Sequence, residues 1–104
     1  MIRVTVSYPT TPGARFDLDY YMKKHMPMVE ERLRKFGMSG YSVSKGLAGG
    51  APGSPAAFMI TAQIHIDTME HVQAGMAAES PTFMADIPNY TDIQPRIQID
   101  EVLV

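Results

Sequence analysis

The segment from Phe58 to Ile66 places an apolar residue at every second position, and this period of two constrains the fold more than any other feature of the chain. Successive side chains of a strand point to opposite faces, so the pattern predicts a strand with one face against a core. The segment from Ile2 to Tyr8 alternates in the same way. Less regular alternation over residues 41–47 and 94–104 predicts two further strands.

The stretch between the first two predicted strands repeats with the period of a helix. At about 100° per residue, one arc of a helix over residues 17–36 collects the apolar side chains and one histidine. The members of this arc are Leu18, Met22, His25, Val29, Leu33 and Phe36. Asp17 is placed to cap the first turn, and Gly37 to end the last one. Pro27 has no amide hydrogen to donate inside a helix, so we expect a kink beside His25.

A second helix is expected directly after the third predicted strand. Asp67, followed three residues later by Glu70, resembles a capping box. The helix would then present three apolar side chains to the core: Met69, Val72 and Met76. Ser80 and Pro81 predict the cap and first residue of a separate short helical turn, and residues 86–92 an irregular polar loop.

The predicted elements follow one another in the order β-α-β-β-α-β. This is the order of the ferredoxin-like split arrangement, an α+β fold in which two helices cover one face of a four-stranded antiparallel sheet. A chain of 104 residues has the size of one domain with one hydrophobic core. We therefore expect a single domain over residues 1–104.

Composition and charge argue against several classes of function. The formal net charge is −2, and no run of Lys or Arg could neutralise a series of phosphates, so nucleic-acid binding is not expected. No segment holds the roughly 20 successive apolar residues of a membrane span, and the first residues already alternate like a strand, so we expect neither a span nor a signal peptide. The absence of cysteine excludes thiolate chemistry and fits a reducing compartment, and the cytoplasm is the expected location.

The face of the predicted sheet that no helix covers carries mostly small, neutral polar side chains. Charged residues make up 19% of the chain, below the roughly 25% of an average globular protein. We expect a homodimer of two copies packed sheet against sheet, and a hydrated free face is the alternative. The residues of this face are Arg3, Thr5, Ser7, Ser42, Ser44, Met59, Thr61, Gln63, His65, Arg96, Gln98 and Asp100.

His25 is the strongest chemical candidate, because it lies on the apolar face of the first helix. Burial disfavours the imidazolium and leaves a neutral ring that can accept or donate a proton near neutral pH. Tyr8 and Tyr41 share the helix-facing side of their strands, and Lys45 lies on the same side as Tyr41, so these side chains could line a cleft with His25. The alternative is a structural histidine with both nitrogens satisfied, tyrosines packed as core and a lysine that reaches solvent.

The other two histidines lie on other surfaces, His65 on the uncovered sheet face and His71 on the solvated side of the second helix. No carboxylate stands at ligand spacing from His25, so no metal site is expected. Gly46 to Gly50 lacks the strand, loop and helix context of a phosphate-binding loop. We expect no bound cofactor.

Several segments resemble, in the same order, the EthD family, which is named after ethyl tert-butyl ether degradation. The resemblance is strongest over Phe16 to Pro27 and over Asp86 to Asp92, with shorter matches at Tyr8-Pro9 and Lys45-Gly46. It implies a dimeric α+β barrel, in which two ferredoxin-like protomers pack sheet to sheet. Relatives on this fold include cofactor-free monooxygenases, isomerases, and dehydratases or cyclases that act on small, often aromatic or polyketide-like molecules.

The resemblance also implies site residues, since the family's motif histidine falls on His25 and its late asparagine and aspartate fall on Asn89 and Asp92. The resulting hypothesis is an enzyme with His25 as general acid and base. Asn89 or Asp92 would orient His25 or close the pocket.

In the same hypothesis Tyr8, Tyr41 and Lys45 contact a small apolar or aromatic substrate with a carbonyl, phenolic or polyketide-like group. The reaction would be a proton transfer, or an oxidation of the oxidoreductase type. A non-catalytic protein that holds a hydrophobic molecule for a partner oxidase is the alternative.

Overall fold

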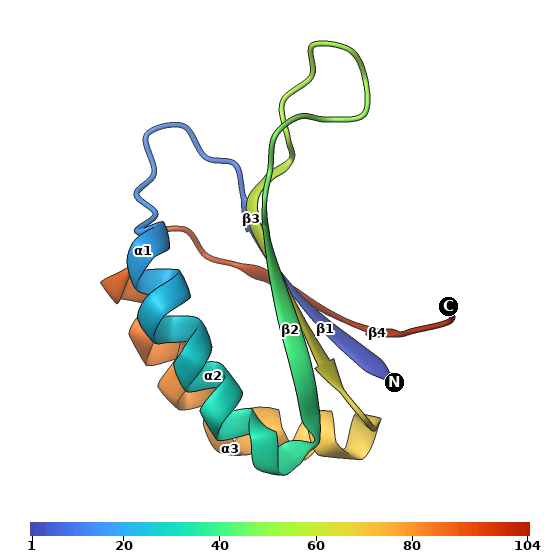
Figure 1. Cartoon of the computed structure of the whole chain (residues 1–104). Helices are drawn as coiled ribbons and strands as arrows, with labels where there is room; N and C mark the ends of the chain where they lie inside the picture. Colours follow the sequence, from blue (N-terminus) through green and yellow to red (C-terminus); the bar gives the residue numbers. More distant parts are fainter.

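The computed structural model describes all 104 residues and contains the predicted four-stranded sheet. The strands lie in the order β2-β3-β1-β4, and every neighbouring pair is antiparallel. Their bounds are β1 Ile2–Pro9, β2 Met38–Lys45, β3 Phe58–Ile66 and β4 Arg96–Glu101. The helices lie side by side on one face of this sheet, and the other face is uncovered (Figure 1). The expected ferredoxin-like α+β fold is confirmed.

The first helical segment is continuous but changes its winding along its length. Its parts are α1 (Leu18–Tyr20), a π-helical turn (Tyr21–His25), α2 (Met26–Leu33) and a 3-10 turn (Arg34–Phe36). Asp17 caps it as predicted, because its carboxylate accepts the amide hydrogen of Tyr20 at 3.0 Å. Gly37 ends it with a φ of 81°, a left-handed conformation that glycine adopts without strain.

A π-helical turn lies where the kink is expected, beside His25, and one side chain predicted to face the core lies outside it. A π-turn holds more residues than an α-turn, so the side chains ahead of it are rotated relative to a regular helix. Tyr21, with 1% of its surface exposed, takes the inward position predicted for Met22, which is 42% exposed. Pro27 lies two residues after the end of this turn and has no amide hydrogen to donate to the helix.

The second helix, α3 (Met69–Asp86), differs from the prediction at three points. Met69 is predicted to face the core, but it lies in the first turn of the helix and is 39% exposed. Thr68 is its cap and accepts the amide hydrogen of His71, while the Asp67 carboxylate instead bonds to Nδ1 of His71 at 2.7 Å. The expected break at Pro81 is wrong, because the helix runs through this residue. The hydroxyl of Ser80 contacts Sδ of Met76 one turn earlier rather than capping a new turn. A 3-10 turn, Ile87–Asn89, follows α3.

The two outer strands are shorter or shifted relative to the prediction. β2 begins at Met38 and ends at Lys45, and β4 covers only Arg96–Glu101. Ile97 and Ile99 lie opposite Val6 and Val4 on the helix side, as predicted, but they are 55% and 40% exposed. They remain exposed because β4 is an edge strand, beyond the part of the sheet that the helices cover (Figure 1).

The hydrophobic core lies between the helices and the two central strands. Its residues from the sheet and the two helical segments include Val4, Tyr8, Ala62, Ile64, Tyr21, Val29, Leu33 and Val72. The uncovered face carries the predicted side chains, with Ser42, Gln63, Thr5 and Gln98 in one row across the strands. None of the helices has the length and apolarity needed to cross a membrane.

Candidate functional site

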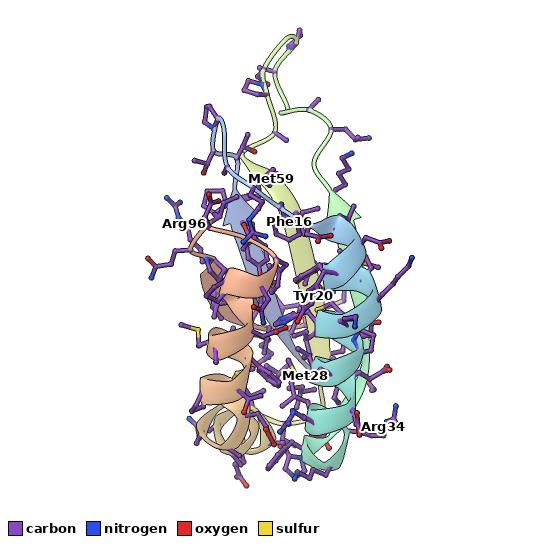
Figure 2. The ribbon with its side chains drawn as sticks, turned by 90° about the vertical axis from the view of Figure 1, so that its left-hand side faces the viewer. Phe16, Tyr20, Met28, Arg34, Met59 and Arg96 are labelled. Carbon is purple, nitrogen blue, oxygen red and sulfur yellow. The ribbon has the colours of Figure 1, made fainter.

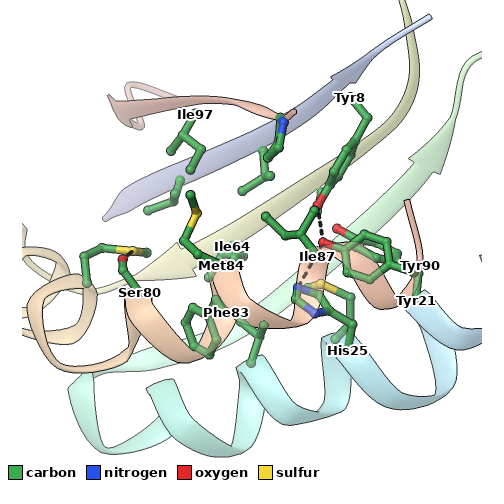
Figure 3. Close-up of a pocket in the computed structure, with 17 residues that line it drawn as sticks. Tyr8, Tyr21, His25, Ile64, Ser80, Phe83, Met84, Ile87, Tyr90 and Ile97 are labelled. Atoms are coloured by element: carbon green, nitrogen blue, oxygen red, sulfur yellow. Dashed lines mark hydrogen bonds between the residues drawn. The ribbon is translucent and has the colours of Figure 1, made fainter. Parts of the chain in front are cut away.

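A cavity with a volume of about 70 Å³ lies between the sheet and the two helical segments (Figure 3). Of its 17 lining residues, 14 are hydrophobic, and none is Lys, Arg, Asp or Glu. For comparison, an apolar cavity of about 150 Å³ in another protein binds benzene. A ligand of that size therefore enters only if side chains at the wall move. Methionine side chains, which are unbranched and adaptable, stand at this wall at Met26, Met76 and Met84.

His25 is buried at the wall of this cavity, at the end of the π-helical turn. Its side chain is 7% exposed, and its Nδ1 lies 2.8 Å from Oδ2 of Asp86, the last residue of α3. Burial lowers the pKa of His25 below its ordinary value, against a smaller opposing effect of the hydrogen bond and charge of Asp86. The ring is therefore neutral at neutral pH, with its hydrogen on Nδ1 and an unprotonated Nε2.

Asp86 is the anion that fixes this tautomer, and three groups donate hydrogen bonds to it. Besides the His25 contact, its Oδ1 accepts the hydroxyl of Tyr20 at 2.6 Å and the amide of Asn89 at 2.9 Å. Burial alone would raise the pKa of Asp86, but the bonds from Tyr20, His25 and Asn89 outweigh it and lower this pKa. Asp86 thus stays ionised beside the neutral ring.

One tyrosine hydroxyl faces the other nitrogen of His25, and a second tyrosine hydroxyl is hydrogen-bonded to the first (Figure 3). The Tyr90 hydroxyl lies 3.5 Å from Nε2, and it shares a 2.7 Å hydrogen bond with the hydroxyl of Tyr8. Burial raises the pKa of both phenols far above the ordinary value. They therefore remain protonated, as hydrogen-bond donors, over the whole neutral range.

Aromatic rings fix the orientation of the imidazole. The Tyr21 ring stacks on it with centroids 5.3 Å apart and planes 15° apart, and the Tyr90 ring lies 4.6 Å away on a tilt. Phe16 packs edge-on against Tyr8, within the same cluster. The imidazole is thus held by packing as well as by its hydrogen bond to Asp86.

The cavity reaches the surface between the end of α3 and β4. Met84 and Ile97 are the exposed members of its lining, at 53% and 55%. All the other lining residues are buried or half-buried. These two side chains therefore form the mouth of the cavity.

The structure brings together only some of the residues proposed from the sequence. Tyr8 and His25 share the cavity wall, whereas Tyr41 and Lys45 do not line it. Both lie on the helix-facing side of β2, opposite Ile64 and Ile60, but β2 is the sheet edge farthest from β4 and the cavity mouth.

The two late-loop residues do not contact His25 directly. Asn89 reaches it through Asp86. The carboxylate of Asp92 instead accepts the backbone amide hydrogen of Arg15 at 3.0 Å, and it does not line the cavity.

Sequence reasoning missed Asp86, Tyr90, Tyr20 and Tyr21 as members of this site. All four belong to the two segments that carry the strongest family resemblance. The presence of an acidic residue in one of these segments and a histidine in the other could have indicated the pair, since a carboxylate is a common partner for a buried histidine. No group of three or more His, Cys, Asp or Glu side chains is placed to hold a metal ion.

Comparison with solved structures shows a protein that is similar over almost the whole chain. An EthD-like protein from Ralstonia eutropha JMP134 is 48% identical, with a TM-score of 0.91 over 99% of this chain and 92% of that one. An EthD family protein from Bacillus halodurans C-125 is 17% identical, with a TM-score of 0.66 over 99% of both chains. A protein from Arabidopsis thaliana is 8% identical, with a TM-score of 0.70 over 100% of this chain and 97% of that one.

The two distant structures share the fold with this chain. No family profile matches the chain, and no curated protein sequence matches it.

Proposed function

This chain belongs to the EthD family, and on that premise we propose that it is an enzyme that moves a proton on a small, uncharged organic molecule. The observation that carries this proposal is the buried His25 at the wall of an apolar cavity, with the Asp86 carboxylate hydrogen-bonded to the far side of its ring. The chemistry proposed is deprotonation of an enolisable carbonyl compound or a phenol. Such a proton transfer needs a positioned base and a stabiliser for the anion, and no bound cofactor.

The base is Nε2 of His25. It is unprotonated because the single ring hydrogen lies on Nδ1, which donates it to Asp86. When Nε2 accepts the proton of the substrate, the imidazolium that forms is stabilised by the Asp86 carboxylate, 2.8 Å away. The lowered pKa of His25 keeps the base ready at neutral pH.

The anion is stabilised by the phenol pair. In an enolisable substrate the C–H bond breaks, its electron pair moves to the carbonyl oxygen, and the proton moves to Nε2. The resulting oxyanion accepts the hydrogen of the Tyr90 hydroxyl, while Tyr8 donates in turn to Tyr90. Return of the proton from Nε2 to the same or a neighbouring carbon completes an exchange or an isomerisation, with all atoms balanced.

The substrate is uncharged. No Lys or Arg lines the cavity, so a carboxylate or phosphate would lose its hydration without gaining a counter-ion. The negative charge of Asp86, on the side of His25 away from the cavity, also disfavours an anionic substrate. The apolar lining suits neutral ketones and phenols. A ligand as large as an aromatic ring enters only if the methionine side chains move.

We also propose that two copies pack through the uncovered sheet face. Its central row, formed by Ser42, Gln63, Thr5 and Gln98, is neutral and suited to hydrogen bonds across a two-fold axis. The cavity lies on the opposite, helix-covered side of the sheet, so such a dimer leaves its mouth free.

Exchange of substrate hydrogen for deuterium tests the proposed activity without knowledge of the product. In heavy water, catalysed exchange into uncharged ketones from butanone to phenylacetone shows that a base removes their protons. Loss of this exchange with His25→Gln supports the proposal. Retained binding of the ketones with no exchange in the native chain would favour a carrier for a partner enzyme instead.

A further inference from the structure

The carboxylate of Asp86 has more partners than its contact with His25 requires. Its Oδ2 meets Nδ1 of His25, while Oδ1 is shared by the Tyr20 hydroxyl at 2.6 Å and the Asn89 amide at 2.9 Å. We propose that Tyr20 and Asn89 are positioning residues, which hold this carboxylate on Nδ1 and thereby keep Nε2 of His25 unprotonated toward the cavity. The proposal rests on the role given to His25 above.

Neither of the two residues can act on a ligand directly. Tyr20 and Asn89 do not line the cavity, and Asn89 is exposed at the protein surface. Their polar side-chain groups converge on Asp86 from different elements, Tyr20 from α1 and Asn89 from the turn after α3. Any influence on the reaction therefore passes through Asp86 to His25.

The π-helical turn is what allows Tyr20 and His25 to reach the same carboxylate. The two residues are five positions apart, and in a regular α-helix they would point about 140° away from each other. A π-turn, with hydrogen bonds five residues apart, brings such positions to one side of the helix. Figure 2 shows Tyr20 in the space between the first helical segment and α3. Asp86 is the last residue of α3.

Two donors are needed because Asp86 lies where a carboxylate is free to turn. It is the last residue of α3, its side chain is 15% exposed, and the only basic side chain within ion-pair distance of it is His25, whose ring is neutral. Without partners, Oδ1 would be drawn toward water, and the plane of the carboxylate would rotate away from Nδ1. The hydroxyl and the amide fix this plane and stabilise the charge that no nearby cation balances.

The test compares the ring nitrogens of His25 by heteronuclear NMR in the native chain and in Tyr20→Phe, Asn89→Ala and the double variant. These spectra report which nitrogen carries the hydrogen, and at which pH the second proton binds. Tyr41→Phe is the matched control, since Tyr41 is a half-buried tyrosine outside this network. Asp86→Asn removes the carboxylate that accepts the hydrogen of Nδ1. Its spectrum is the reference for a His25 ring without this anion.

We expect the ratio of the Nδ1–H to the Nε2–H tautomer to fall about tenfold in the double variant, the equivalent of one lost hydrogen bond. The pKa of His25 should also fall, because the hydrogen bond that the ring donates to Asp86 raises it. An unchanged ratio, or a rise in this pKa, would overturn the proposal. If Tyr20→Phe does not fold, the exposed Asn89→Ala decides the question by the same readout.

The readout needs no substrate, and this separates the two proposals. Exchange activity that survives His25→Gln would end the catalytic assignment while the tautomer shift stands. Intact tautomers in the double variant would end the positioning assignment while the activity stands.

Discussion

Nδ1 of His25 lies 2.8 Å from Oδ2 of Asp86, and this contact joins two residues that are 61 positions apart in the sequence. It places the ring hydrogen on the side away from the cavity and leaves Nε2 as the basic atom. The same contact ties the end of the π-helical turn to the last residue of α3. The geometry of the base therefore depends on both helical segments at once.

Replacement of Asp86 with asparagine should reduce catalysed proton exchange by about 10²–10⁴-fold. The amide cannot stabilise the imidazolium, and its hydrogens favour the tautomer with the hydrogen on Nε2. The rate of deuterium incorporation into an accepted ketone measures this. Asp67→Asn is the matched control, because it removes the partner of the exposed His71. A rate within twofold of the native chain would contradict the role of Asp86.

The stability of the fold should fall at both acidic and alkaline pH, with separate causes. The pKa of His25 lies below 6.5 in the folded chain because of burial, so the unfolded chain binds this proton first and stability falls as the pH drops below 6.5. The pKa of Asp86 lies below 3.8, so its contribution is lost as the pH falls further, below 3.8. Urea unfolding over a pH series measures both losses, and His25→Gln should remove the first.

The alkaline loss comes from the buried phenols. Burial raises the pKa values of Tyr8, Tyr21 and Tyr90 above 10.0, so the unfolded chain releases their protons first. Their contribution is complete below pH 10.0 and is lost as the pH rises above it. The same urea series, extended upward, measures this. Stability that is independent of pH above 10.0 would show that these hydroxyls are not buried.

Much of this architecture is predictable from the sequence because it follows from local patterns. The alternation over Phe58–Ile66 corresponds to β3 without change, and it places Ile64 against the helices. Tyr8 and His25 face inward for the same reason, since each lies on the apolar side of its own element.

The site was less predictable, because it depends on contacts between distant segments and on one irregular turn. A regular period of 3.6 residues places Met22 inward, and only the π-turn rotates Tyr21 into its place. Lys45 lies on the predicted, helix-facing side of its strand, but the order of the strands places β2 at the edge of the sheet farthest from the cavity mouth. The sequence predicts a loop at Asp86, because the helix is expected to break at Pro81, whereas α3 continues through Pro81 to Asp86.

Substitutions at the mouth of the cavity should change which ligands enter rather than the chemistry. Met84→Ala widens the gap beside Ile97, so the KM for phenylacetone should fall several-fold while that for butanone changes little. Met84→Trp should have the opposite effect on phenylacetone. Met69→Ala, at an exposed methionine at the start of the same helix, is the control. Equal effects on both ketones would place the entrance elsewhere.

A charge in the centre of the uncovered sheet face should separate the proposed dimer. Thr5 lies between Gln63 and Gln98, so Thr5→Glu brings two like charges close together near the two-fold axis. Sedimentation analysis should then show a monomer, whereas Gln73→Glu on the exposed side of α3 should leave the assembly unchanged. An unaltered dimer in Thr5→Glu, or a native chain that is monomeric, would exclude an interface on this face.

The role of His25 as a base is the central claim, and deuterium exchange tests it most directly. The initial rate of exchange into a panel of uncharged ketones is measured in heavy water for the native chain, His25→Gln and the control His71→Gln. We predict exchange that rises with pH to a plateau, with a midpoint below 6.5, and that falls by about 10²–10⁴-fold in His25→Gln alone. Exchange that is absent for every ketone, or equal in the native chain and His25→Gln, would contradict the account.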